Sequence, residues 1–212
     1  MALLETEECG GVRLAMWAPL EETDVLEVLL GNAVMCSHIK TSTASDKRRK
    51  ELLTANILLK HITGRDCVIE HDEGGKPFSL ELGMNISVSH CSRCIAVAVS
   101  NEAVGIDVEN IGCRQMAVAE KFLSVVERGY LSAVADRDRY AALLWSVKEA
   151  VYKLVSVNGL SFVDDISVPY FILRNDGVLP AYCNTGAERR GIVLFYRFYP
   201  NFISVIARFG AV

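Results

Sequence analysis

The sequence predicts an α+β fold made of two lobes within one chain. Helical periodicity is followed by a run of alternating strands in both halves, and no linker or low-complexity segment divides the 212 residues. We expect an N-terminal lobe over residues 1–102 and a C-terminal lobe over residues 103–212, each with helices packed on a mainly antiparallel sheet. Ligand clefts often form where lobes meet, so we expect the active site between them.

The first half alternates between helical and extended patterns. Ser45 or Asp46 is placed to cap a long helix that runs through Lys60, and Gly64 follows its end. Asn101 and its neighbour join two strands in the manner of a hairpin. The other predicted elements are a strand at 11–19, a short helix at 21–30, a glycine-rich loop at 71–77, and strands at 84–89, 94–100 and 103–109.

The second half begins with helices and ends with strands. Ser124 and Glu127 have the spacing of a capping box, so a helix is expected to start there. Asp136 or Asp138 starts a long helix that ends before Asn158. The remaining predicted elements are helical residues 114–123 and strands at 165–173, 177–182, 192–199 and 202–209.

Composition limits the class of protein. A net charge of −4 argues against indiscriminate nucleic-acid binding, although residues 47–50 form a local basic run. Residues 1–10 lack the pattern of a signal peptide, and no apolar run approaches the ~18 residues that a membrane span needs. Seven cysteines, an odd number, favour free thiols in a reducing cytoplasm.

Two short segments carry the chemistry. On a strand, Asp107 and Glu109 point to one face; on a helix, Glu149 and Lys153 lie one turn apart on one stripe. If the segments meet, three carboxylates converge beside a lysine, an arrangement that a hard divalent cation relieves. We therefore expect Mg²⁺ and a phosphate-bearing substrate. Taken alone, each pair has a simpler alternative: a solvent-facing strand, or a surface ion pair worth ~0.3–0.5 kcal/mol.

Five motifs, in this order along the chain, resemble those of the 4′-phosphopantetheinyl transferases. The match is closest to the longer, single-chain type that activates surfactin synthetase. The motifs are Gly75-Lys76-Pro77, Asn85-Ile86-Ser87-Val88-Ser89-His90, Gly105-Ile106-Asp107-Val108-Glu109, Phe122-Leu123-Ser124-x-x-Glu127 and Trp145-Ser146-Val147-Lys148-Glu149-Ala150-x-x-Lys153.

The resemblance implies a pseudo-symmetric two-lobed fold and a defined reaction. The phosphopantetheine arm of coenzyme A passes to a serine of an apo carrier protein, and 3′,5′-ADP leaves. Carrier proteins of fatty-acid, polyketide and nonribosomal peptide synthesis all present such a serine, so the sequence leaves the pathway open. Mg²⁺ is the expected metal, although Mn²⁺ suits the same oxygens. Because one chain holds both lobes, no dimer is needed to complete the site, and we expect a monomer.

Roles at the reacting centre also follow from the resemblance. Asp107, Glu109 and Glu149 become the metal ligands, with the metal bridging the pyrophosphate. Glu149 is also a candidate general base, acting directly or through a metal-bound water. Lys153 would donate a proton to the departing 3′,5′-ADP or stabilise it electrostatically.

The resemblance places coenzyme A against the first lobe. His90 would contact the pyrophosphate and Ser89 the phosphates, while Lys76 would lie near a phosphate or the adenine. One residue of the 47–50 run, with Arg48 and Arg49 as the candidates carried forward, would hold the 3′-phosphate. A solvated helix face is the alternative for that run.

Neighbouring residues receive lesser roles. Trp145 and Phe122 are interpreted as core packing, Glu127 as a helix cap, and Lys148 as a supporting residue at most. Cys91 and its partner three residues on form a lone C-x-x-C, which we interpret as a chance occurrence in a hairpin.

Two rival functions stay open at this stage. A metal-dependent hydrolase of coenzyme A-like pyrophosphates would use the same carboxylates to deliver water. A degenerate, non-catalytic member would bind carrier proteins or coenzyme A without turnover. The carboxylates and Lys153 argue against the second rival, and product formation without a carrier protein would favour the first.

Overall fold

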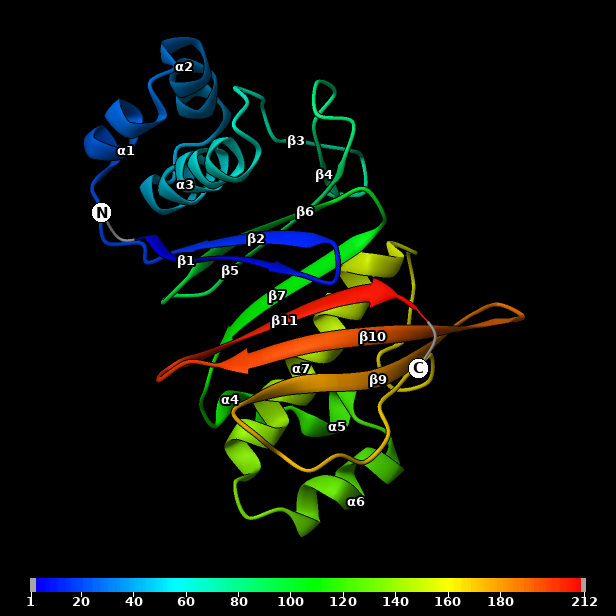
Figure 1. Cartoon of the computed structure of the whole chain (residues 1–212). Helices are drawn as coiled ribbons and strands as arrows, with labels where there is room; N and C mark the ends of the chain where they lie inside the picture. Colours follow the sequence, from blue (N-terminus) through cyan, green and yellow to red (C-terminus); the bar gives the residue numbers. More distant parts are fainter. Residues whose placement is uncertain (1–2, 211–212) are drawn as a thin grey trace. The chain divides into compact units, whose positions relative to one another are not determined.

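A computed structural model describes residues 3–210 of the chain. The chain divides into two compact units, Met1–Glu102 and Ala103–Val212. Each contains helices and an antiparallel sheet, which confirms the α+β prediction (Figure 1). Among the helices of residues 3–210, none has the length and apolar character needed to cross a membrane.

The first unit is a four-stranded sheet covered by helices. Its strand order is β1-β2-β6-β5, and every neighbouring pair is antiparallel. The elements are β1 (Leu3–Cys9), β2 (Val12–Trp17), α1 (Thr23–Leu30), α2 (Ala33–Ser42), α3 (Asp46–Thr63), β3 (Glu70–His71), β4 (Pro77–Phe78), β5 (Asn85–His90) and β6 (Ile95–Ser100).

Helix α3 carries the core of this unit. The Ser45 side chain accepts a hydrogen bond from the Arg48 backbone at 3.3 Å, and Gly64 ends the helix in a left-handed conformation, as predicted. The buried Leu58 and Leu59 on α3 belong to one apolar cluster with residues of β2, β5 and β6. This packing holds α3 against the sheet, and the basic run lies in the first turns of the helix.

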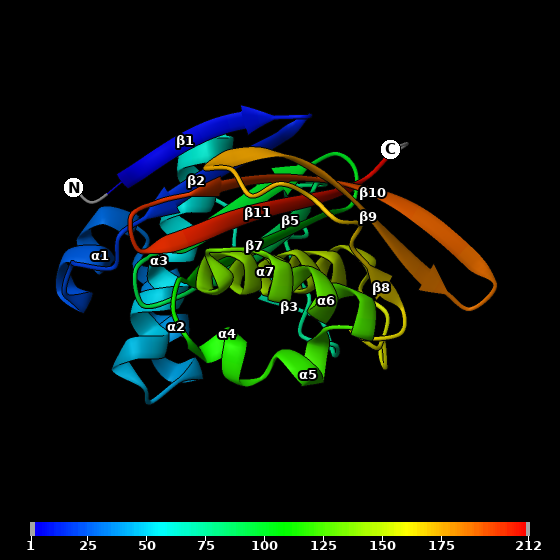
Figure 2. The ribbon, with the colours of Figure 1, turned by 90° about the horizontal axis from the view of Figure 1, so that it is seen from below.

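The second unit is a five-stranded antiparallel sheet packed on a long helix. Its strand order is β7-β11-β10-β9-β8. Figure 2 shows α7 running along one face of this sheet, and α7 contacts both β7 and β11. The elements are β7 (Val104–Asn110), α4 (Arg114–Ala117), α5 (Ala119–Phe122), α6 (Val125–Ala133), α7 (Arg137–Val155), β8 (Ile166–Ser167), β9 (Asp176–Thr185), β10 (Glu188–Phe198) and β11 (Phe202–Phe209).

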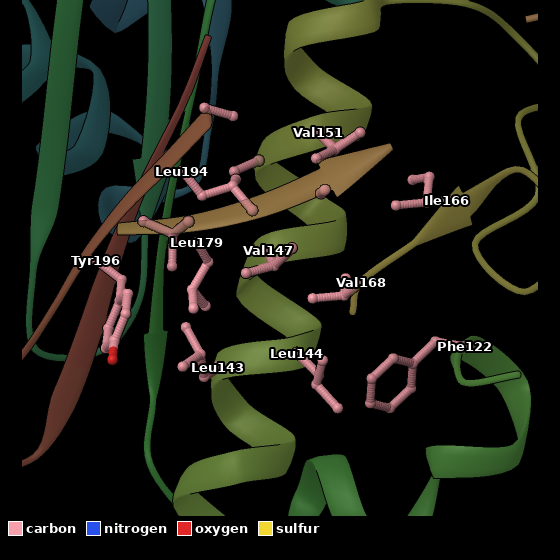
Figure 3. Packing of buried hydrophobic residues seen from close by; sticks show 14 of the residues in the cluster. Phe122, Leu143, Leu144, Val147, Val151, Ile166, Val168, Leu179, Leu194 and Tyr196 are labelled. Carbon is pink, nitrogen blue, oxygen red and sulfur yellow. The ribbon is translucent and has the colours of Figure 1, made fainter. Parts of the chain in front are cut away.

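The core of the second unit lies between α7 and the sheet. Val147 and Val151 of α7 belong to one buried cluster with Leu179 of β9 and Leu194 of β10 (Figure 3). Because these positions recur at helical spacing on α7 and at alternate positions on the strands, the core follows from the two periodicities. It sets the rotation of α7 and therefore where Glu149 lies.

Several elements differ from the sequence-based expectation. Strand β1 and helix α2 were not predicted, and the helical residues 114–123 form two short helices. The predicted strand at 165–173 is reduced to Ile166–Ser167. Pro169 cannot donate a ladder hydrogen bond, and Phe171 stacks on Tyr140 of α7 at 4.5 Å instead of extending the sheet.

Candidate active site

The carboxylates of β7 face helix α7. A Cβ built on Gly105 would point into the backbone of α7. Side chains two residues apart on a strand share a face, so Asp107 and Glu109 also point toward α7. Asp107 is buried at 6% exposure, and Glu109 is half-buried. The glycine allows the strand and the helix to approach closely enough for their side chains to meet.

Helix α7 supplies the partners. The Lys153 ammonium donates to the Asp107 carboxylate at 2.9 Å and to the Ile106 carbonyl at 3.0 Å. Lys153 is therefore held by β7, because two acceptors of that strand fix its nitrogen. One turn earlier on the same helix, Glu149 is half-buried beside these groups.

The three carboxylates influence one another electrostatically. Burial raises the pKa of Glu149 above its ordinary value, and the nearby Asp107 carboxylate raises it further, against the opposing effect of Lys153. Burial also raises the pKa of Glu109, opposed mainly by the hydrogen bond that its side chain accepts from the Asn110 backbone at 2.7 Å. Asp107 adds to the increase at Glu109.

The donor set fits a hard divalent cation in its chemistry, since all three side chains offer carboxylate oxygens and repel one another. In the described part of the chain, however, no three or more His, Cys, Asp and Glu side chains stand close enough to form a ready-made metal-binding group. One reason is that the Glu109 carboxylate accepts a hydrogen bond from the Asn110 backbone of its own strand.

A cavity of about 370 Å³ lies beside Glu109 and Glu149 within the second unit. Its wall is mostly apolar, with the basic side chains of Arg114 and Lys121 among the lining residues. The full lining consists of Glu109, Arg114, Gln115, Val118, Lys121, Phe122, Trp145, Glu149 and Phe162.

The interpretation of Trp145 as core packing was incomplete. Its ring is half-buried, lines the cavity, and meets Phe122 edge-on at 5.0 Å and Phe162 at 6.0 Å. Trp145 stands four residues before Glu149, so the helical period that aligned Glu149 with Lys153 already placed this ring on the same stripe.

The first unit gathers a second group of predicted residues. Arg48 lies 3.1 Å from the Glu51 carboxylate, and His90 Nδ1 lies 3.4 Å from its other oxygen. These three side chains and His71 line a small cavity of about 20 Å³, room for about one water. Ser89 is buried next to His90. Glu51 was not predicted as a site residue, because nothing in the sequence pairs it with His90, 39 positions away.

The other basic residues lie apart from this group. Arg49 donates to the Thr43 carbonyl at 3.4 Å and faces Asp46 at 3.8 Å, so its guanidinium turns toward the start of α3. Lys50 pairs with Glu22 and Asp46.

Lys76 follows a tight turn of the first unit. The Asp72 side chain accepts a hydrogen bond from the Lys76 backbone at 2.8 Å, and Gly75 has a φ of 81°, which glycine adopts readily. No hydrogen bond or ion pair holds the Lys76 ammonium among residues 3–210.

Cys91 and Cys94 close the β5–β6 hairpin. The Cys91 backbone donates to the Cys94 carbonyl at 2.8 Å, and both side chains are free thiols. Burial strongly raises the pKa of Cys94, which makes it a poor nucleophile.

Comparisons with known proteins identify one family that the chain is similar to. Residues 103–192 match the 4′-phosphopantetheinyl transferase superfamily. The chain is 33% identical over 127 residues to the 4′-phosphopantetheinyl transferase psf-1 of Bacillus pumilus, covering 55% of this chain and 53% of that protein. It is 30% identical over 137 residues to the 4′-phosphopantetheinyl transferase Sfp of Bacillus subtilis strain 168, covering 59% of each. A third relative, gsp of Aneurinibacillus migulanus, is 29% identical over 109 residues, which are 50% of this chain and 46% of gsp.

The matched regions span about half the length of these relatives. The superfamily match includes β7, α7 and the three carboxylates described above. Residues 103–192 are thus similar to the 4′-phosphopantetheinyl transferase superfamily, and the chain resembles the Sfp type.

Proposed function

We propose that this protein transfers the 4′-phosphopantetheine arm of coenzyme A to a serine hydroxyl of an apo carrier protein. The serine oxygen forms a bond to the phosphorus of the arm, the pyrophosphate bond breaks, and 3′,5′-ADP leaves with the electron pair of that bond. The observation that supports this most is the close packing of β7 on α7, which joins Asp107 to Lys153 and places Glu109 and Glu149 at one cavity.

Asp107, Glu109 and Glu149 would hold a divalent cation, with Mg²⁺ as the proposed ion. When bound, such an ion orients a pyrophosphate and neutralises charge that develops on it. Glu149 is suited to accept the serine proton, because its raised pKa brings it closer to that of an effective base at neutral pH. Lys153, held by Asp107, presents an ammonium that can stabilise the leaving group.

Coenzyme A would use the first unit as well. Arg48 and His90 share the Glu51 carboxylate, and the Lys76 ammonium adds a cation on a tight turn. Ser89 precedes His90 in β5 and is proposed as a further phosphate contact. For the 3′-phosphate, Arg48 is a better candidate than Arg49, whose guanidinium is turned toward Thr43 and Asp46. We also propose that this group and the β7–α7 group serve one substrate.

The cavity beside Glu149 suits a carrier protein. Its apolar wall can receive the segment that bears the serine, and Arg114 and Lys121 can meet acidic side chains next to that serine. A cytoplasmic, monomeric enzyme completes the proposal; the seven free cysteines support a reducing compartment.

The test measures release of 3′,5′-ADP from coenzyme A with and without an apo carrier protein. Transfer predicts release only when the carrier is present, in a one-to-one ratio with modified carrier. Release without the carrier would identify a hydrolase and contradict the proposal. No release in either tube, across several carriers, would contradict both activities.

A further inference from the structure

A charged pair lies buried in the second unit, away from the reacting groups. Lys148 is 0% exposed, and its side-chain nitrogen lies 2.7 Å from the carboxylate of Glu127, which is 2% exposed. Buried charges of this kind are rare because removing them from water is costly. Sequence analysis gave these residues only the roles of a support and a helix cap.

Every polar atom of the pair is used. The Lys148 ammonium also donates to the Phe162 carbonyl at 2.6 Å and the Ile166 carbonyl at 3.1 Å, so all three of its protons have acceptors. Glu127 accepts from the Ser124 backbone at 2.8 Å and from the Val168 backbone at 3.1 Å. The pair therefore joins three separate segments: the start of α6, the middle of α7 and residues 162–168.

Stability alone does not explain such a pair. A well-packed apolar pair of similar volume often gives equal or greater stability than a buried ion pair. What an apolar pair cannot do is hold two backbone carbonyls and two backbone N–H groups in fixed directions. Residues 162–165 lie outside the helices and strands, and these hydrogen bonds attach the backbone at Phe162 and Ile166 to α7.

The attached segment forms a wall of the cavity. Phe162 lines the cavity together with Trp145 and Glu149, and its ring is 5.8 Å from that of Tyr152 on α7. Its own carbonyl is the one that Lys148 holds at 2.6 Å. Figure 3 shows Val168, just beyond this segment, near Val147 of α7, and Ile166 further along the helix on the side of Val151.

We propose that Lys148 is a positioning residue: through its bonds to Glu127 and to the 162–166 backbone, it fixes Phe162 as the wall against which the carrier protein docks. The docking role rests on the proposed function, whereas the fixing of the segment does not. Neither residue of the pair needs to touch a substrate for this role.

The test replaces both charges by uncharged residues of similar size, E127Q/K148M, so that no unpaired charge is buried. K60M is the matched control, because Lys60 loses the same ammonium from an exposed pair with Asp66. Hydrogen exchange of the peptide covering 160–168 is expected to rise by about tenfold or more in the double variant, with β9–β11 and α7 unchanged. K60M should exchange in 160–168 like the wild type.

Kinetics supply the readout that a merely structural role would not alter. The KM for the apo carrier protein should rise by about tenfold in E127Q/K148M, while the KM for coenzyme A stays close to wild type. Wild-type exchange in 160–168, or equal changes in both KM values, would overturn the proposal. If the double variant does not fold, F162A tests the same wall with the pair intact, and a wild-type carrier KM in F162A would overturn the docking role. If no transfer occurs at all, the exchange result still decides whether Lys148 fixes the segment.

Discussion

Replacing Gly105 by alanine would place a methyl group where the backbone of α7 already lies. A Cβ at this position would be 2.0 Å from the Ala150 carbonyl oxygen and 2.8 Å from the Leu154 nitrogen. Ordinary contacts of this kind begin at 3.4 Å. Both neighbours are backbone atoms of a packed helix, so neither can rotate away, and β7 and α7 would have to separate by about 1 Å or more.

The cost should be large for a single methyl group. Overpacking a rigid core typically costs about 1–3 kcal/mol, and the backbone contact here puts G105A at or above the upper end, about 3 kcal/mol. For a protein of this length, that corresponds to a melting temperature lower by roughly 6–12 °C. The same separation would pull Asp107 from Lys153, now at 2.9 Å, and we expect transfer to fall by about 100-fold.

Thermal unfolding and steady-state transfer measure the two effects. G129A is the matched control, since no atom lies within 4 Å of a Cβ at that helical position. Alanine there should raise stability by up to about 1 kcal/mol and leave transfer unchanged. A melting temperature for G105A within 2 °C of wild type, a bound well below the ~6 °C shift expected here, would refute the close packing of β7 on α7.

Two further predictions concern the charged groups. E149Q should reduce transfer by about 100-fold or more. Because burial and Asp107 raise the pKa of Glu149 in the folded protein, its ionised form opposes folding at neutral pH, so E149Q should be more stable than wild type at pH 7. This gain should shrink as pH falls through the raised pKa of the folded state and vanish well below 4.5, where the wild-type carboxyl is protonated in both states. Denaturant titrations at several pH values check it, with the exposed Glu120 changed to Gln as control. A gain that grows on acidification would show the opposite pKa shift. E51Q should remove the carboxylate that Arg48 and His90 share, and calorimetry should then show 3′,5′-ADP binding tighter by about 2–5-fold. Weaker binding would show instead that Glu51 orients His90 for the ligand.

Local periodicity was sufficient for part of the site. The strand period placed Asp107 and Glu109 on one face, and the helix period placed Glu149 beside Lys153. Periodicity cannot show which elements pack together, so the bond between Asp107 and Lys153 required the structure.

The burial of Lys148 had a signal in the sequence. Leu144 lies four residues before it and Val151 three residues after it, so Lys148 stands within an apolar stripe of α7. Its partner lies 21 positions away, and only the path of α6 and residues 162–168 brings the two together. The closeness of Gly105 to Ala150 had no comparable signal, because it depends on the distance between two backbones.

The most direct test of the central claim is the intact mass of an apo acyl carrier protein after incubation with this protein, coenzyme A and Mg²⁺. We predict a gain of ~340 Da, one covalently attached phosphopantetheine arm, which is lost when EDTA is added or when E149Q replaces the wild type. An unchanged mass for every carrier tried, or a gain that persists in EDTA, would contradict it.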